Sequence, residues 1–230
     1  MFSETFIWIT VFAVLAAVVN GIGILTIFKR KKWAEKAKTY FMCFAAGMLI
    51  STPLILILPT AVQKNFYAGY SALIGFLFIF FSNKLIEHYT KKKKLSFGIV
   101  AVEGIGIHSL IDGIIYTVTF SVSIFMGVLA ATGLVIHEFA EGVITYLLLV
   151  YAFLVAALTT PLGAFVAYPF IKTLGDSHMG LMLGFSAGVI IYISASHLLP
   201  ESRKDEQKHS TIAFLGGIGL ALIIVLTKLL

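Results

Sequence analysis

Long apolar segments separated by short polar breaks make up nearly the whole chain. They lie near residues 5–28, 40–62, 67–88, 96–120, 126–149, 151–171, 178–200 and 210–230. One membrane-spanning helix needs about 20 apolar residues, so eight spans use about 160. Only 12% of the residues are charged, too few to cover a water-soluble surface. We therefore predict an all-α polytopic membrane protein in which residues 1–230 form a single domain of eight transmembrane helices.

The boundary between the fifth and sixth segments carries no polar break, because residues 126–171 are almost continuously apolar. A single helix of this length would extend about 69 Å at ~1.5 Å per residue. The hydrocarbon core of a bilayer is only about 30 Å thick. The chain must therefore turn back once, and we expect that turn near Val150–Ala152.

The distribution of basic residues favours an even number of spans. With eight spans, all but three of the 17 lysines and arginines lie in the loops of one side; the exceptions are Lys64, Lys172 and Lys228. Basic loops are retained in the cytoplasm, which predicts a cell-membrane protein with both termini extracellular. The net charge of +6 has the same origin and does not indicate a nucleic-acid partner.

Two stretches of sequence resemble one another across the chain. The second segment contains Phe-Ala-Ala-Gly at residues 44–47 and Leu-Pro at 58–59, and the seventh contains Phe-Ser-Ala-Gly at 185–188 and Leu-Pro at 199–200. The offset is constant at 141 residues. Since these two spans cross in opposite directions, the match predicts an inverted-topology repeat, which is common in transporters. Chance similarity between apolar segments is the alternative explanation.

A second duplication places ionisable residues inside the fourth and fifth segments. Residues 107–114 read Ile-His-Ser-Leu-Ile-Asp-Gly-Ile, and residues 136–143 read Ile-His-Glu-Phe-Ala-Glu-Gly-Val. In a helix, positions i and i+4 lie on one face, about 6 Å apart. Each motif therefore presents a histidine and a carboxylate together near the middle of the bilayer. The candidate ligands are His108, Asp112, His137, Glu138 and Glu141, with Ser109 as a weaker one.

The buried carboxylates require compensation. Each costs about 2.5–3.5 kcal/mol at the centre of a bilayer, so three facing lipid would cost roughly 8–10 kcal/mol. They must face one another, a cavity or a cation; a hydrogen-bonded network that only joins the two spans is the structural alternative. Imidazole and carboxylate donors suit zinc, ferrous iron and manganese, and a set without thiolates disfavours copper(I). The residues thus predict a metal site between spans four and five of an inverted-repeat helical bundle.

With these motifs the chain resembles the ZIP (Zrt/Irt-like) metal transporter family, as a divergent, bacterial-type member. The resemblance extends to Pro-Leu-Gly-Ala at residues 161–164 and His-Leu-Leu-Pro-Glu at 197–201. It implies eight spans, extracellular termini, a homodimer in the lipid bilayer, and movement of zinc, or of iron, manganese or cadmium, into the cytoplasm. The metal is then the transported substrate rather than a cofactor, and the protein is not an enzyme.

The chain departs from the family pattern at several motif positions. Asparagine is replaced by Ser109 and glutamate by Asp112, and two prolines are replaced by Ile111 and Ala140. Thr160 stands where a glutamate is common before the proline of span six. The replaced prolines predict weaker breaks in helices four and five.

Further polar residues lie near the cytoplasmic ends of the spans, where they could receive metal that leaves the central site. Ordinary interfacial polarity is the alternative. These candidates for an exit path are His197, Glu201, Glu103, Glu87 and His88.

Two other functions are also compatible with these residues. An intramembrane zinc-dependent hydrolase would use three protein ligands and a metal-bound water. A metal sensor without flux is the third, although the short loops leave little with which to signal. The duplicated mid-bilayer motifs and the predicted inverted repeat favour a transporter.

Overall fold

The computed structural model describes residues 3–93, 97–145, 150–204 and 207–226. Within these ranges, side chains are not described at residues 86–87, 89–93, 97–108, 140–141, 144–145 and 150–157. Every regular element in the described ranges is a helix, which confirms the all-α prediction for this part of the chain.

The helices follow one another with short connections. In chain order they are α1 (Glu4–Lys29), α2 (Lys31–Thr52), the π-helical η1 (Pro53–Ile57), α3 (Leu58–Lys64), α4 (Ala68–Lys93), α5 (Phe97–Val122), α6 (Ile124–Thr145), α7 (Val150–Ile171), α8 (Asp176–Tyr192), the π-helical η3 (Ile193–Leu198), α9 (Leu199–Lys204) and α10 (Ser210–Leu226). Because α2, η1 and α3 are contiguous, as are α8, η3 and α9, each of these triplets forms one long helical segment.

Several of these helices have the length and composition to cross a membrane. Within the described ranges, four segments qualify: Glu4–Lys29, Lys31–Lys64, Ala68–Leu85 and Asp176–Lys204. Shorter apolar stretches lie in the other four long helices, at Ser109–Val122, Ile124–Phe139, Leu158–Ile171 and Ser210–Leu226. Helices are the expected solution, because a bilayer provides no water to satisfy backbone N–H and C=O groups.

Two helix boundaries differ from the expected segments. Helix α2 begins at Lys31 rather than near residue 40. Lysine, alanine and glutamate are good helix formers, so the helix extends beyond the apolar stretch that hydropathy detects. Helix α7 begins at Val150, one residue before the expected sixth segment. The turn expected near Val150–Ala152 adjoins residues 146–149, which lie outside the described residues.

Both π-helical segments precede a proline of the sequence repeat. Segment η1 ends just before Leu58-Pro59, and η3 ends just before Leu199-Pro200. A proline ring clashes with the carbonyl four residues earlier in an α-helix. A π-type turn widens the helix locally and is a known way to accommodate such an interruption. The two matched stretches therefore share a local distortion as well as residues.

The helices that carry the repeat pack on their neighbours in the same way. Helix α2 packs on α10, and α8 packs on α4. A methyl group at Gly47 would lie 2.2 Å from the carbonyl oxygen of Phe214. At its repeat partner, Gly188, a methyl group would lie 1.8 Å from the carbonyl oxygen of Ala72. Only glycine permits an approach this close at either position.

The reciprocal contacts match as well. A methyl group at Gly217 on α10 would lie 2.0 Å from the carbonyl oxygen of Phe44. A methyl group at Gly75 on α4 would lie 2.2 Å from that of Phe185. Phe44 and Phe185 are the first residues of the repeated motif, so the same pair of glycine contacts joins α2 to α10 and α8 to α4.

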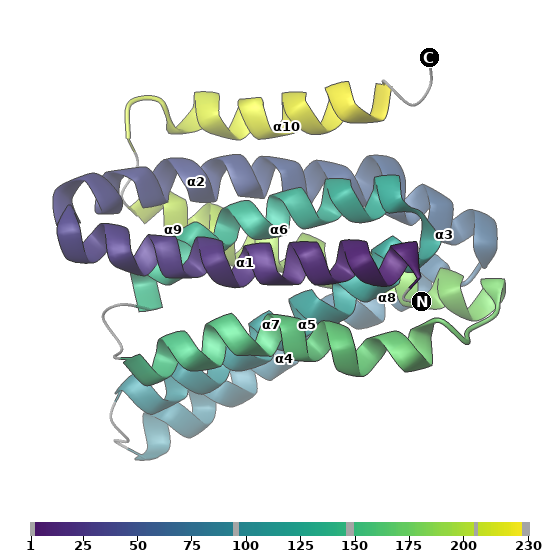
Figure 1. Ribbon diagram of the computed structural model, residues 1–230, viewed down its shortest axis with the longest axis horizontal. Coiled ribbons are helices and arrows are strands. Elements are labelled where there is room, and N and C mark those ends of the chain that lie inside the picture. Colours follow the sequence, from purple (N-terminus) through teal and green to yellow (C-terminus); the bar gives the residue numbers. More distant parts are fainter. Residues whose placement is uncertain (1–2, 94–96, 146–149, 205–206, 227–230) are drawn as a thin grey trace.

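Figure 1 shows the arrangement that results. Helix α1 packs against α6 and α7, α6 packs against α2, and α5 packs against α7. Helix α10 lies on the outer side of α2, at the top of the view. The start of α1 and the end of α10 lie at the same end of the bundle, on the right. The chain thus returns to the end at which it begins.

Candidate metal centre

A one-residue connection brings the two ionisable motifs together. Ser123 alone separates α5 from α6, and its hydroxyl accepts a hydrogen bond from the Met126 amide at 3.1 Å, as an N-cap does. The two helices fold back on each other and pack together. Asp112 and His137 lie at comparable distances before and after this turn, so they come to a similar depth.

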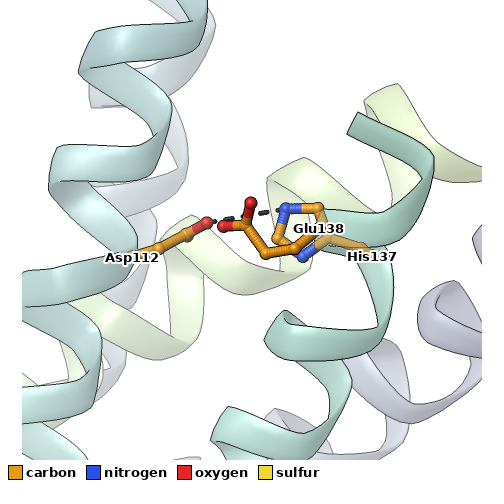
Figure 2. Close-up of side chains that lie close together, drawn as sticks. All are labelled: Asp112, His137 and Glu138. Atoms are coloured by element: carbon orange, nitrogen blue, oxygen red, sulfur yellow. Dashed lines mark ion pairs between the residues drawn. The ribbon is translucent and has the colours of Figure 1, made fainter. Parts of the chain in front are cut away.

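Three side chains of these motifs form a compact buried group. Each of Asp112, His137 and Glu138 offers one ligand atom, and these atoms all lie within 4.8 Å of one another. The Nε2 atom of His137 lies 3.5 Å from Oδ2 of Asp112. Figure 2 shows Asp112 reaching from α5 toward His137 and Glu138, which project from α6. All three are at most 2% exposed.

Helix α1 contributes to the same group. The Asn20 side chain is completely buried, and its Nδ2 donates a 2.9 Å hydrogen bond to Oε2 of Glu138. Sequence reasoning misses this residue, because a single asparagine in an apolar span carries no motif. The only available signal is its polarity within the otherwise apolar stretch from residue 11 to 25.

Glycines allow α1 to approach α6 closely enough for this hydrogen bond. A methyl group at Gly142 would lie 2.1 Å from the carbonyl oxygen of Asn20. A methyl group at Gly23 would lie 2.4 Å from that of Phe139. The backbones of α1 and α6 are therefore in direct contact beside the buried group.

The same contacts recur between α5 and α7. A methyl group at Gly113 would lie 2.0 Å from the carbonyl oxygen of Thr160, and one at Gly163 would lie 2.1 Å from that of Leu110. Gly113 directly follows Asp112, as Gly142 follows Glu141 in the other motif. Thr160 on α7 thus occupies the place that Asn20 occupies on α1, next to an acid-bearing helix.

The two helices that carry this group, α5 and α6, contain no fixed positive charge, and neither does α7, which packs on α5. Residues 95–171, which include α5, α6 and α7, contain no lysine or arginine. Burying carboxylates without compensation is costly. A group of two buried carboxylates and an imidazole therefore suits a bound cation, and zinc or a neighbouring divalent transition metal matches these donors.

The other predicted ligands are placed only in part. Ser109 is fully buried on α5. His108 lies on α5 and Glu141 on α6, but their side chains fall outside the described residues. Both helices continue without interruption past Ile111 and Ala140, as expected where the motif prolines are replaced.

Within the described residues, the side chains proposed for an exit path do not lie together in one cluster. The side chains of Glu87 and Glu103 are outside the described part of the chain. His88 on α4 and His197 on η3 are exposed. Glu201 on α9 accepts a 2.5 Å hydrogen bond from Lys204, so its charge is already compensated.

Similarity to known proteins agrees with this chemistry. No protein-family model matches the chain. A curated relative, the zinc transporter ZupT of Chlorobium chlorochromatii (strain CaD3), is 29% identical over 264 residues, covering 96% of this chain and 95% of the relative. The chain is similar to a zinc transporter over nearly its whole length. Together with the apolar helices, this similarity supports an integral membrane protein with a group able to hold a metal ion.

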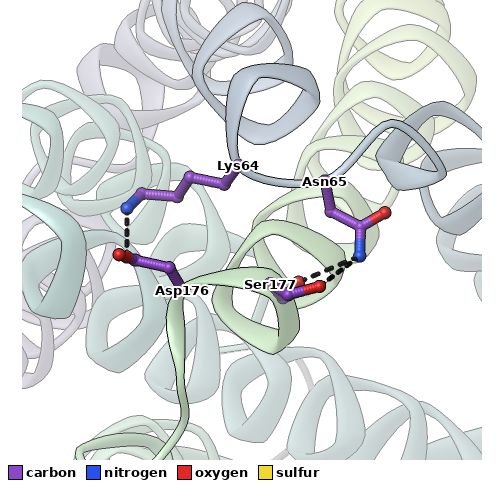
Figure 3. A network of polar contacts seen from close by, with 4 residues as sticks. All are labelled: Lys64, Asn65, Asp176 and Ser177. Carbon is purple, nitrogen blue, oxygen red and sulfur yellow. Dashed lines mark hydrogen bonds and ion pairs between the residues drawn. The ribbon is translucent and has the colours of Figure 1, made fainter.

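A second polar network lies away from this centre. Figure 3 shows Lys64, at the end of α3, joined to Asp176, the first residue of α8, by a 2.6 Å salt bridge. Beside it, the Asn65 amide donates to the hydroxyl and to the carbonyl oxygen of Ser177. Asp176 precedes the seventh predicted span and, being paired with Lys64, is poorly suited to gather metal. These contacts join the α3–α4 connection to the start of α8.

Proposed function

We propose that the chain is a ZIP-family secondary transporter that carries zinc, or a related divalent metal, across the membrane toward the cytoplasm. The observation that supports this most directly is the buried group of Asp112, His137 and Glu138 between α5 and α6. The similarity to a protein named as a zinc transporter favours zinc as the substrate and transport over hydrolysis.

The charges of this group suit a single divalent ion. With a neutral imidazole, the carboxylates of Asp112 and Glu138 balance one ion of charge +2. Glu141, if it also faces the site, would leave one negative charge. Two ions would leave a positive excess in surroundings that penalise unpaired charge. We therefore propose that one ion is held tightly at a time.

The matched glycine contacts favour an inverted repeat. Four glycine contacts among α1, α2, α6 and α10 have counterparts among α7, α8, α5 and α4, and α2–η1–α3 resembles α8–η3–α9 in its distortion. A site at the interface of two such halves is typical of transporters that open alternately to either side. We infer that α5 and α6 are equivalent elements that hold the metal where the two halves meet.

Uptake of radioactive zinc into proteoliposomes tests the proposal. We expect the wild-type protein to accumulate zinc. His137→Ala is expected to lose at least about 10-fold in both uptake and zinc affinity, because removing a residue that only hydrogen-bonds a metal ligand already weakens metal affinity by about 10-fold or more. The matched control is His209→Ala, which removes an exposed histidine between α9 and α10. Zinc binding without uptake of zinc, iron, manganese or cadmium would contradict transport.

A further inference from the structure

We propose that Asn20 is a positioning residue of the metal site: its amide N–H holds one oxygen of Glu138 and so fixes the orientation in which that carboxylate binds the ion. This inference rests on the proposed function and adds a residue from α1, outside both ionisable motifs. It follows from the 2.9 Å hydrogen bond between Asn20 Nδ2 and Glu138 Oε2, made where both side chains are buried.

The chemistry of the amide suits this role. A lysine or arginine beside Glu138 would stabilise its carboxylate but would repel an incoming cation. An asparagine amide donates a hydrogen bond without a net charge, so it stabilises the anion and leaves the full negative charge for the metal. Carboxylates that bind metals are commonly held by such hydrogen bonds, and their loss typically weakens metal affinity by about 10–100-fold.

The position of the backbone also fits a dedicated role. The contacts of Gly142 with Asn20 and of Gly23 with Phe139 fix α1 against α6 at this level. The asparagine is therefore held by main-chain packing rather than by its own hydrogen bond. Its Oδ1 is buried and makes no hydrogen bond within the described part of the chain. An asparagine kept only to join the two helices would be expected to use both of its polar atoms.

The sequence allows this role to be tested on the unaltered protein. The chain contains three asparagines, Asn20, Asn65 and Asn83. Selective labelling with ¹⁵N-asparagine therefore gives three side-chain amides. Asn65 contacts Ser177 and Asn83 donates to Tyr192, so both serve as internal controls. On adding zinc, we expect the Asn20 signal to shift in step with metal binding while the other two stay in place.

A variant then separates positioning from structural support. Asn20→Leu keeps the branched shape of the side chain but removes the donor. The control is Thr119→Val on α5, which removes a buried hydroxyl that, within the described residues, bonds to backbone carbonyls of its own helix. We expect Asn20→Leu to bind zinc about 10–100-fold more weakly and to alter the visible absorption bands of bound cobalt(II). Thr119→Val is expected to keep both the affinity and the bands.

The possible results are distinct. Zinc binding that leaves the Asn20 signal unmoved, or an Asn20→Leu variant with wild-type affinity and cobalt spectrum, would overturn the positioning role without affecting the proposed function. If the wild type binds none of the candidate metals, the proposed function and this inference both fall. If Asn20→Leu does not fold, the labelled wild-type protein still decides the question.

Discussion

At the scale of single residues, Thr160 and Asn20 form an instructive pair. The backbone carbonyl oxygen of each residue packs against a glycine of the neighbouring helix that carries an ionisable motif. Asn20 donates to Glu138, whereas the hydroxyl of Thr160 is buried and makes no hydrogen bond within the described residues. The two positions are equivalent in packing but differ in chemistry. A charged residue at Thr160 would change the number of positive charges that the site can balance.

We predict that Thr160→Glu binds a second zinc ion. The added carboxylate supplies negative charge near Asp112, and a second divalent ion would compensate it. The zinc content of the purified protein, measured by metal analysis, is expected to rise from one toward two ions per chain. Thr160→Gln has the same length without the charge and should retain one. Equal metal content in the two variants would contradict the charge argument.

Sequence reasoning selects Asp112, His137 and Glu138 as candidate ligands because they belong to a duplicated pattern, and the structure brings their side chains into one buried group. All three lie in apolar helices, where an ionisable side chain is costly to bury and therefore indicates a functional site. Asn20 could not be predicted in this way. A lone amide costs far less to bury than a carboxylate, and its link to Glu138 depends on how α1 packs against α6, which no spacing along the chain encodes.

At the scale of helices, α10 shows how differently neighbouring glycines can act. Gly217 faces α2, and any side chain there would meet the backbone of Phe44. At Gly219, no atom of another helix in the described part of the chain lies within 4 Å of the position a methyl group would take. Gly217 and Gly219 are two residues apart on α10, but only at Gly217 does the backbone of another described helix occupy the space of an added methyl group.

We predict that Gly217→Ala destabilises the protein while Gly219→Ala is tolerated. A backbone obstacle cannot rotate away as a side chain can, so α2 and α10 must separate, at a cost of about 1–3 kcal/mol as in other overpacked cores. Thermal denaturation in detergent micelles would measure the difference. A Gly217→Ala variant as stable as Gly219→Ala would show that this contact does not govern the packing of α10.

The sequence indicates the helices themselves well, since long apolar runs in a bilayer have few options. It is less informative about their ends and distortions. The start of α2 at Lys31 reflects helix propensity beyond the apolar stretch. The π-helical segments η1 and η3 each precede a proline of the repeat, but a proline alone does not specify whether a helix kinks, breaks or widens.

At the scale of the whole molecule, the start of α1 and the end of α10 lie at the same end of the bundle. This arrangement agrees with an even number of crossings. The basic residues on both sides of the α1–α2 connection and those of α9 then belong to the opposite side, which the distribution of charge predicts to be cytoplasmic.

We predict that both chain ends label from outside the cell. Cys43, the only cysteine, would be replaced by alanine, and single cysteines introduced by Ser3→Cys, Leu230→Cys and Lys204→Cys. A membrane-impermeant maleimide should react with the first two on intact cells and with the third only after permeabilisation. Labelling of Ser3→Cys and Leu230→Cys from different sides would imply an odd number of spans.

The connection between α1 and α2 consists of Arg30 alone, whose N–H still bonds to Thr26 at the end of α1. One residue bridges at most about 3.6 Å, so it acts as a short tether at that end of the molecule. Unless a helix end unwinds, α1 cannot move along its axis relative to α2. Any motion of α1 relative to α2 that keeps both helices intact is therefore a rotation about Arg30, in which Glu4 moves furthest and Asn20, nearer Arg30, moves less.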